Sequence, residues 1–362
     1  MMEENIMLHG GNVWQSASPS DWLDYSANLR PEGMADWTRE CFARGMERAR
    51  YYPDLGMSAA RSSLAAFAGV APECLLPTAG GIAAIDLACA LAPGRVLIMP
   101  PTFGEYARRA RAHGREVAVY VGEGSRAWGD MAGCLSFGPC ADALRAGDTL
   151  FLCNPDNPSG ETLGRGEVLA LAALAARRGA RLVVDEAFID YCPEHSVRAE
   201  AAEGRWPLTV VASLTKILGV PGARLGYLVA DADYVRAAQA QALPWALNSC
   251  AAEIAAKVDK HAADIAADGA LNTGRRERLA RALSALGISV MPSGANFLLV
   301  RLDVPAREVA QELKRAGILT RDCASFGALD EHYMRLAVKT DAENERLTRE
   351  MDRALAALGR AL

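Results

Sequence analysis

The chain has 362 residues, with 51% hydrophobic and 23% charged side chains, which is typical of an ordinary globular protein. This length exceeds what one hydrophobic core usually supports, so we expect two domains. A formal net charge of −5 without a dense Lys/Arg tract, and the lack of any run of about 18 apolar residues, argue against a nucleic-acid-binding or membrane-spanning protein.

The N-terminus and the cysteines predict a cytoplasmic protein. The chain begins with Met1-Met2-Glu3-Glu4 and shows no apolar segment of the kind found in signal peptides. The nine cysteines are odd in number and scattered, no pair forms Cys-x-x-Cys, and none shares a metal-like spacing with the five histidines. We therefore expect reduced thiols and no metal site.

The first part of the chain is irregular over about 30 residues and then forms helices and strands. Helical patterns cover residues 36–50, 58–68, 82–92 and 103–113, and strand-like runs cover residues 96–99 and 116–121. The helix at 82–92 is apolar nearly all round, which predicts that it is buried. Residues 122–147 are rich in glycine and show no clear period.

From residue 149 onward, strands and helices alternate. Strand-like runs lie at residues 149–153, 181–184, 208–212 and 225–229, with a helical pattern at residues 167–178. This alternation predicts an α/β fold in which a mainly parallel sheet carries helices on both faces.

The C-terminal third predicts a smaller α/β domain. An Ala-rich helical region at 231–269, interrupted by Pro244, is followed by helices at 273–286 and 306–316 and strands at 288–291, 297–302 and 334–337. We therefore expect an N-terminal arm (1–40) that contributes to the small domain and the active site, a large domain (41–240) and a small domain (241–362).

The segment around Lys216 is the strongest candidate for chemistry. Lys216 follows a buried strand-like run and Ser213, and burial would lower the pKa of its ammonium group. A neutral amine forms a Schiff base with an aldehyde, and the nearby Arg224 suits a phosphate. Taken alone, Ser-x-x-Lys is more often a solvated lysine in a Gly-rich loop.

Three further segments place polar groups where open α/β sheets bind ligands. Asn157 lies in Asn-Pro-Asp-Asn-Pro, whose prolines fix the backbone, so that its amide can donate to a phenolate oxygen. Asp185 follows the strand at 181–184 and can pair with a pyridinium nitrogen. Ala79-Gly80-Gly81 precedes the buried helix and can offer backbone N–H groups to a phosphate.

Each of these segments also has a purely structural explanation: a rigid loop, a helix N-cap and a common helix start. Their order favours the functional interpretation, because Asn157, Asp185 and Lys216 each follow a strand of one parallel sheet. An aldehyde, a phosphate, a phenolate oxygen and a pyridine nitrogen together describe pyridoxal 5′-phosphate (PLP).

With these motifs the chain resembles, over nearly its whole length, the fold-type I PLP enzymes of the aspartate aminotransferase class. The resemblance implies that Lys216 forms the Schiff base, that Asp185 pairs with the pyridine nitrogen and that Asn157 contacts the ring hydroxyl. The phosphate ligands that it implies are Ala79, Gly80, Gly81, Ser213 and Arg224.

The same resemblance implies three more roles. Phe103, which follows Pro101-Thr102, stacks on the cofactor ring. Tyr52 of Tyr-Pro-Asp reaches the phosphate bound by a partner subunit, which implies a homodimer with shared active sites. Arg335 holds the α-carboxylate of the substrate, and its planar fork matches a carboxylate in a way that a lysine does not.

Two branches of this family fit, the histidinol-phosphate aminotransferases and the threonine-phosphate decarboxylases of cobalamin biosynthesis. The chain resembles the decarboxylases more. Phe188 stands where the aminotransferases usually have a tyrosine that donates to the ring oxygen. The decarboxylase-like motifs are His9-Gly10-Gly11-Asn12, Asp24-Tyr25-Ser26-Ala27-Asn28, Ser213-Leu214-Thr215-Lys216, Val220-Pro221-Gly222 and Arg321-Asp322-Cys323.

The resemblance therefore implies decarboxylation of a small phosphorylated amino acid, with L-threonine O-3-phosphate as the first candidate and transamination of histidinol phosphate as the alternative. The expected substrate ligands are His9, Gly10, Asn28, Asn157, Arg321 and Arg335. Of these, Arg321, His9 and Asn28 lie near the distal phosphate, to which Gly10 and Gly11 offer backbone N–H groups. Lys339 departs from the pattern, since the decarboxylases often have an arginine there. O-phosphoserine, which lacks one methyl group, stays open as a substrate.

Overall fold

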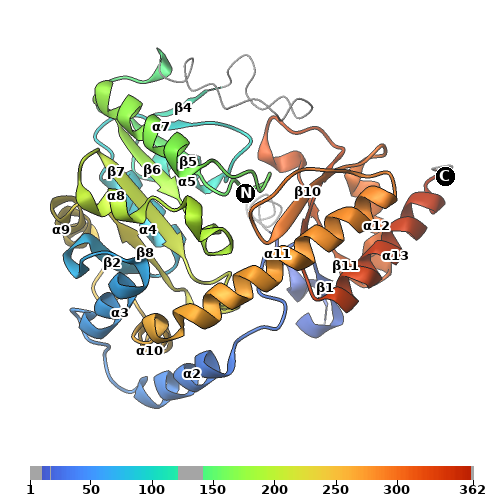
Figure 1. Ribbon diagram of the computed structural model, residues 1–362, viewed down its shortest axis with the longest axis horizontal. Coiled ribbons are helices and arrows are strands. Elements are labelled where there is room, and N and C mark those ends of the chain that lie inside the picture. The colour runs from blue at the N-terminus through green and yellow to red at the C-terminus, as the bar shows by residue number, and fades with distance from the viewer. Residues whose placement is uncertain (1–9, 17, 121–141, 360–362) are drawn as a thin grey trace.

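The computed structural model describes residues 10–16, 18–120 and 142–359. They form a large α/β part, built on a seven-stranded sheet, and a smaller α/β part toward the C-terminus (Figure 1). The predicted α/β class with a mainly parallel sheet is confirmed. Most of the Gly-rich segment at 122–147 lies outside the described residues.

The large sheet has the strand order β2-β8-β7-β6-β5-β3-β4, and only β8 runs antiparallel to its neighbours. Its strands are β2 (Leu75–Thr78), β3 (Val96–Ile98), β4 (Val117–Val119), β5 (Thr149–Cys153), β6 (Arg181–Asp185), β7 (Leu208–Ser213) and β8 (Gly226–Val229). The sequence does not predict β2, because this strand is short and contains Pro77, a residue that sheets tolerate mainly in edge strands such as this one.

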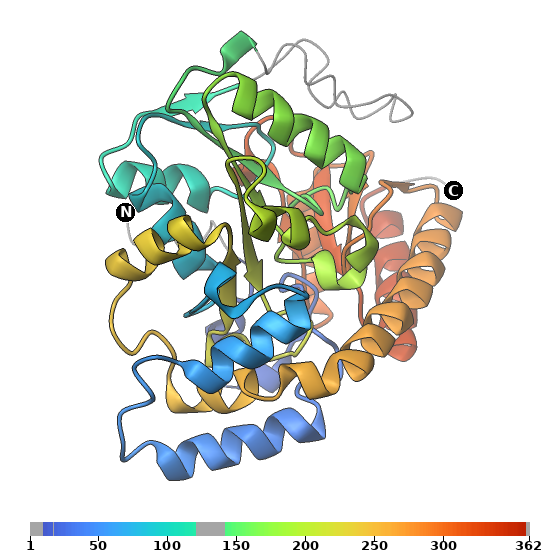
Figure 2. The same ribbon diagram turned by 60° about the vertical axis from the view of Figure 1, so that its left-hand side comes forward.

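Helices cover both faces of this sheet, and alternate strand residues point to the two faces. Val183 packs on one side, whereas Leu182 and Val184 pack on the other. Figure 2 shows α5 and α9 on one side of the sheet and α7 on the other. The first face carries α4 (Gly81–Ala90), α5 (Glu105–Ala112) and α9 (Ala232–Gln241), and the second carries α3 (Ser58–Ala68), α7 (Arg165–Arg177) and α8 (Arg198–Glu203).

The smaller part contains a four-stranded antiparallel sheet with the order β12-β13-β10-β9. Its strands are β9 (Ser289–Val290), β10 (Phe297–Arg301), β12 (Arg321–Asp322) and β13 (Tyr333–Ala337), and its helices are α12 (Ala306–Arg315) and α13 (Asp341–Ala357). The N-terminal strand β1 (Leu23–Asp24) joins this part by parallel pairing with β11 (Ile318–Leu319). The predicted domain limits at residues 40 and 240 stay a prediction.

One prediction for the second half of the chain is wrong. The sequence predicts a helix that ends near Gly269 and a new one that begins at residue 273, but α11 (Ala262–Ala285) runs through both positions. Gly269 lets the helix pack closely against the backbone at Asp190, since a Cβ at this position would lie 2.8 Å from the Asp190 carbonyl oxygen. Helix α11 consequently extends from the large part to the small part (Figure 1).

Two helices, α2 (Asp36–Arg48) and α10 (Ser249–Ala255), form a pair at the edge of the large part (Figure 1). Among the described residues, no helix is both long and apolar enough to cross a membrane. The described part of the chain also holds no cluster of three His, Cys, Asp or Glu side chains arranged for a metal ion, and its seven cysteines are free thiols.

Candidate active site

Three neighbouring strands, β5, β6 and β7, end at one edge of the large sheet. In their register Cys153 lies opposite Asp185, and Asp185 lies opposite Val211. Asp185 is the last residue of β6, and the turns after β5 and β7 bring Asn157 and Lys216 to the same edge, where open α/β sheets bind their ligands. The structure thus brings together the three residues that the sequence analysis singled out first.

Lys216 follows β7 at this edge and is half-buried. Burial, assisted by the charges of Arg224 and Arg335, lowers the pKa of its ammonium group to about 8, while Asp185 acts in the opposite direction. The lowered lysine pKa that we predicted from the sequence is confirmed. Because the neutral amine is accessible near neutral pH, Lys216 can act as a nucleophile toward an aldehyde.

Asp185 is a buried carboxylate whose two oxygens each accept one hydrogen bond. The Tyr106 hydroxyl donates to Oδ2 (2.7 Å), and the Ala187 backbone N–H donates to Oδ1 (3.0 Å). Burial raises the pKa of Asp185 to about 6, although these hydrogen bonds and the charge of Lys216 lower it. A cation placed beside this carboxylate, such as a protonated pyridine nitrogen, would stabilise its ionised form.

The N-terminus of α4 forms a closely packed cradle with Ser213 and Arg224. A Cβ on Gly80 would lie 2.9 Å from Arg224 Nη2, and a Cβ on Gly81 would lie 3.1 Å from Ser213 Cβ. The hydroxyl oxygens of Ser213 and Thr215 are 2.8 Å apart. Helix N–H groups, two hydroxyls and a guanidinium therefore converge on one volume, which suits a phosphate group.

Ala79 and Phe103 flank this cradle and the Asp185 carboxylate. Ala79 lies half-buried in the turn between β2 and α4. The Phe103 ring contacts Tyr106 edge to face, with 5.7 Å between ring centroids. Phe103 therefore lies next to the tyrosine that donates to Asp185, which is compatible with stacking on a ring held by that carboxylate.

Arg335 is a buried guanidinium held from two sides. Its Nη1 donates to Asn157 Oδ1, and its Nη2 donates to the backbone carbonyl of Ser26 (2.9 Å). Its Nε is buried without a hydrogen-bond partner among the described residues. Burial lowers the pKa of Arg335 to about 10. A fixed guanidinium with an unused N–H group is a ready ligand for a carboxylate.

Arg321 lies directly opposite Arg335 in the antiparallel pair of β12 and β13. The two residues are only 8% and 6% exposed, and burial is the largest cause that lowers the pKa of each. Arg321 Nη2 donates to Ser325 Oγ (2.8 Å). Like charges at directly opposed positions of two strands are destabilising, so this arrangement suits a ligand that carries two anionic groups.

The N-terminal arm covers this pair of arginines. Asn28 is buried, and its Oδ1 has no hydrogen-bond partner among the described residues. Gly10 contacts Ser26 so closely that a Cβ on Gly10 would lie 2.1 Å from the Ser26 carbonyl oxygen. His9, the remaining predicted phosphate ligand, lies outside the described residues.

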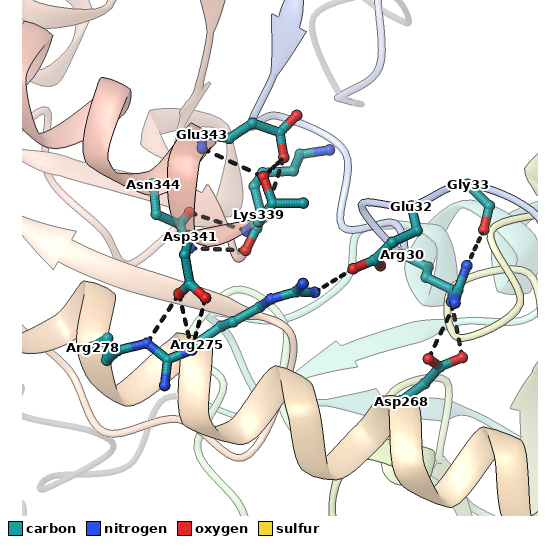
Figure 3. Close-up of polar contacts among 11 residues, drawn as sticks. Arg30, Glu32, Gly33, Asp268, Arg275, Arg278, Lys339, Asp341, Glu343 and Asn344 are labelled. Atoms are coloured by element: carbon teal, nitrogen blue, oxygen red, sulfur yellow. Dashed lines mark hydrogen bonds and ion pairs between the residues drawn. The ribbon is translucent and has the colours of Figure 1, made fainter.

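Ion pairs tie the next part of this arm to α11 (Figure 3). The Arg30 guanidinium binds the carboxylate of Asp268 at 2.8 Å, and Glu32 pairs with Arg275 at 2.6 Å. The Arg30 backbone N–H donates to the Lys216 carbonyl (3.1 Å). The helix that extends to the small part therefore holds the arm against the turn that carries Lys216.

Tyr52 is the one described candidate that lies apart from the others. Its side chain is 80% exposed and stacks on Trp245, with 4.6 Å between ring centroids. The residue forms part of an exposed apolar face rather than part of the site on its own chain.

The comparisons with known proteins agree with this geometry. The model of the family "Aminotransferase class I and II" matches residues 22–351. The chain belongs to the class I and II aminotransferase family. A threonine-phosphate decarboxylase of Salmonella typhimurium is 33% identical over 351 residues, covering 94% of both chains. A histidinol-phosphate aminotransferase of Xanthomonas euvesicatoria is 32% identical over 357 residues, covering 95% of this chain and 90% of that protein.

A solved structure, that of L-threonine-O-3-phosphate decarboxylase from Porphyromonas gingivalis, has the same fold with a TM-score of 0.79. It is 29% identical to this chain and covers 92% of this chain and 99% of its own. Some of these relatives are named as decarboxylases and others as aminotransferases. Membership of the aminotransferase family therefore does not by itself decide the reaction.

Members of the class I and II aminotransferase family bind PLP, and the residues of this chain fit that cofactor. A Cβ on Gly80 would lie 2.9 Å from Arg224 Nη2, so only a glycine here lets the guanidinium approach the α4 N-terminus as a phosphate cradle requires. The buried Asp185 lacks a cation of its own at hydrogen-bond distance among the described residues, and Lys216 has the lowered pKa that Schiff-base formation requires. PLP is therefore the cofactor of this family member.

Sequence reasoning missed two contributors to this aminotransferase-family site. In the sequence, Tyr106 looks like another apolar position of a helix. The structure shows that its hydroxyl donates a hydrogen bond to Asp185. Ser26 reads as part of a motif, without a sign that its carbonyl accepts from Arg335. The alternation of polar and apolar residues in Asp24-Tyr25-Ser26 is the signal that could have indicated this contact, because such alternation is typical of a half-buried strand end.

The lowered pKa of Lys216 predicts how the uptake of PLP by cofactor-free protein depends on pH. Because only the neutral amine reacts, we expect the uptake rate to rise about tenfold per pH unit below the lysine pKa and to level off above about pH 8. The absorbance change after mixing with PLP measures this rate. A rate that is still rising tenfold per unit above about pH 9 would contradict the lowered pKa.

Proposed function

We propose that this protein is a PLP-dependent decarboxylase of an O-phosphorylated amino acid, with L-threonine O-3-phosphate as its first candidate substrate. The observation that carries the proposal is the opposed pair of Arg321 and Arg335 on β12 and β13. L-threonine O-3-phosphate has a carboxylate and a phosphate, one anionic group for each guanidinium. Histidinol phosphate has a phosphate and no carboxylate.

Each candidate residue has a defined task in this proposal. Arg335 and Asn157 hold the α-carboxylate, Arg321 and Asn28 hold the distal phosphate, and His9 and Gly10 assist at that end. Bound PLP supplies an electron sink for the bond that breaks at Cα. The Asp185 carboxylate would stabilise a protonated nitrogen in the cofactor ring. The Lys216 amine is the group placed to donate or accept a proton at the reacting carbon.

The choice between decarboxylation and transamination depends on which bond at Cα stands perpendicular to the cofactor ring. In a decarboxylase that bond leads to the carboxylate, which leaves as CO₂ while a proton takes its place. The product from L-threonine O-3-phosphate would be (R)-1-amino-2-propanol O-2-phosphate. The position of the carboxylate is set by Arg335, whose guanidinium is fixed by Asn157 and by the Ser26 carbonyl.

Phe188 supports the decarboxylase branch through the resemblance, although the lack of a tyrosine does not by itself choose the reaction. Its side chain is 5% exposed and packs edge to face on Phe297, with 5.0 Å between ring centroids. Phe297 in turn lies 5.3 Å below the Arg335 guanidinium. Phe188 therefore packs behind the Phe297 ring on which the Arg335 guanidinium lies. It offers no hydroxyl to a ring oxygen, unlike the tyrosine that the aminotransferases usually have at this position.

The second candidate function is transamination of histidinol phosphate. It is favoured by the 32% identity to a histidinol-phosphate aminotransferase over nearly the whole chain. The two functions differ in their need for a keto acid, because a transaminase must regenerate its cofactor with one such as 2-oxoglutarate.

A comparison of two substrates tests the proposal. We expect PLP-loaded protein to release CO₂ from L-threonine O-3-phosphate, and to leave histidinol phosphate unchanged in the presence of 2-oxoglutarate. O-phosphoserine serves as the second phosphorylated substrate, since it differs by one methyl group, which is worth about 1 kcal/mol. Formation of glutamate from histidinol phosphate and 2-oxoglutarate, without CO₂ release from either phosphoamino acid, would refute the decarboxylase.

We also propose that the protein forms a homodimer with shared active sites. The support is an exposed apolar face near α2 and α10 that contains Tyr52 and Trp245. Its exposed members are Met46, Tyr51, Tyr52 and Trp245, which are 62%, 63%, 80% and 43% exposed. A face of this kind is typical of a protein–protein contact, and in the dimer Tyr52 would reach the phosphate held by the partner subunit.

Trp245→Glu is expected to weaken this dimer by at least about 100-fold, because it places a charge in the centre of an apolar contact. Sedimentation equilibrium measures the change in the dimer dissociation constant. Leu271→Glu is the matched control, since Leu271 is 46% exposed but lies on α11. Equal dissociation constants for the two variants would show that the face around Trp245 is not the dimer contact.

A further inference from the structure

Ser26 contacts the elements that hold both ends of the proposed substrate. Its backbone carbonyl accepts from Arg335 Nη2 at 2.9 Å, at the carboxylate end. Its side-chain Oγ accepts from the Gly11 backbone N–H at 2.7 Å, in the turn that leads to the phosphate end. Because the Gly11 N–H is engaged in this way, Gly10 and not Gly11 is the glycine of this turn left to bind a phosphate.

Ser26 itself has little freedom to move. Asp24 Oδ1 accepts from both its backbone N–H (2.8 Å) and its hydroxyl (2.6 Å). The preceding Tyr25 is fixed on two sides, since its N–H donates to the Leu319 carbonyl and its carbonyl accepts from Ala337. Ser26 is only 5% exposed, so water competes weakly for these hydrogen bonds.

The Gly10–Gly11 turn, in contrast, has few attachments of its own. Gly10 fits against the Ser26 carbonyl only because it has no side chain, and Gly11 adopts a left-handed conformation with φ of 83°. Among the described residues, the hydrogen bond from Gly11 to Ser26 Oγ is the one that joins this turn to the residues that follow β1. The position of this turn therefore depends on the Ser26 hydroxyl.

We propose that the Ser26–Asp24 pair is a positioning and specificity element that sets the distance between the carboxylate end and the phosphate end of the site. This inference rests on the proposed function, since it assumes a phosphate at the distal end. Asp24 Oδ1 accepts the hydrogen bond that the Ser26 hydroxyl donates, and this orients the hydroxyl so that an oxygen lone pair faces the Gly11 N–H. The turn is thereby held at a fixed distance from the carbonyl that anchors Arg335.

Two amines that differ only in the phosphate test this inference, 1-amino-2-propanol O-2-phosphate and 1-amino-2-propanol. Neither has a carboxylate to lose, so their dissociation constants with PLP-loaded protein can be measured by calorimetry. The ratio of the two constants reports the contribution of the phosphate end. We expect Ser26→Ala to reduce this ratio about tenfold, as expected for the loss of one buried hydrogen bond.

L-Alanine, which has the carboxylate alone, should bind wild type and Ser26→Ala within about twofold, because the variant keeps the backbone carbonyl that holds Arg335. Asp24→Asn should retain most of the wild-type ratio, since an amide oxygen can accept both hydrogen bonds of Asp24 Oδ1. Asp24→Ala should behave like Ser26→Ala.

Ser63→Ala is the matched control. Ser63 is 6% exposed, donates to Asp259 Oδ1 at 2.6 Å and accepts from the Asp259 backbone N–H at 3.2 Å, the same chemistry on α3. It should leave the ratio unchanged. If Ser26→Ala weakens all three ligands by the same factor, the pair has only a structural role and the inference is overturned. If wild type itself binds the two amines equally, the proposed phosphate site fails instead.

Discussion

Lys216→Ala is expected to lower kcat by at least about 10⁴-fold, the largest effect of any single substitution in this protein. The variant loses the amine with the lowered pKa and, with it, the group placed to carry a proton at the reacting carbon. The cradle of Arg224, Ser213 and the α4 N-terminus is left intact. Lys216→Ala should therefore still bind PLP, without the covalent bond.

Steady-state turnover and retention of the cofactor on dialysis measure the two parts of this prediction. Lys257→Ala is the control, because Lys257 is also partly buried but lies beyond α10. It should keep wild-type turnover. Full turnover of Lys216→Ala would refute every catalytic role that we assign to this lysine.

Arg335→Lys is expected to raise the KM for L-threonine O-3-phosphate about 100-fold. A lysine keeps the positive charge but loses the planar fork that donates to Asn157 and Ser26 and offers its Nε to the substrate. Because the α-carboxylate would no longer be held in one orientation, kcat should fall as well.

Arg276→Lys provides a matched control for this change. Arg276 is a half-buried arginine that donates to the Ala295 carbonyl at 3.0 Å, and burial lowers its pKa. The Arg276→Lys variant should keep KM within about twofold of wild type, since Arg276 makes no hydrogen bond to a site residue in the part of the chain that the structure describes. A KM that rises equally in both variants would show that Arg335 supports the fold rather than the carboxylate.

The large sheet was predictable because its strands carry a strong local signal. Strands β5, β6 and β7 are buried on both faces, so each reads as a continuous apolar run bounded by polar residues. The errors occurred where tertiary contacts overrode local preference. Pro77 is accommodated in β2, and Gly269 lies inside α11 because the helix packs tightly on the backbone at Asp190.

The candidate site was predictable to the extent that it lies at strand ends. Asn157, Asp185 and Lys216 lie at or just after the ends of neighbouring parallel strands, so chain order alone places them together. The opposition of Arg321 and Arg335 could not be predicted, because it depends on the register of two strands joined by an irregular loop. The hydrogen bonds of Tyr106 and Ser26 likewise join residues that are distant in sequence.

The central claim, decarboxylation of a phosphorylated amino acid, is tested most directly by counting CO₂ per active site. PLP-loaded protein is mixed with excess L-threonine O-3-phosphate in the absence of any keto acid, and CO₂ and amine products are measured together. Our account predicts many equivalents of CO₂ per site, matched by (R)-1-amino-2-propanol O-2-phosphate, with the cofactor still in its aldehyde form. Absence of CO₂, with conversion of the cofactor to its amine form, would contradict it.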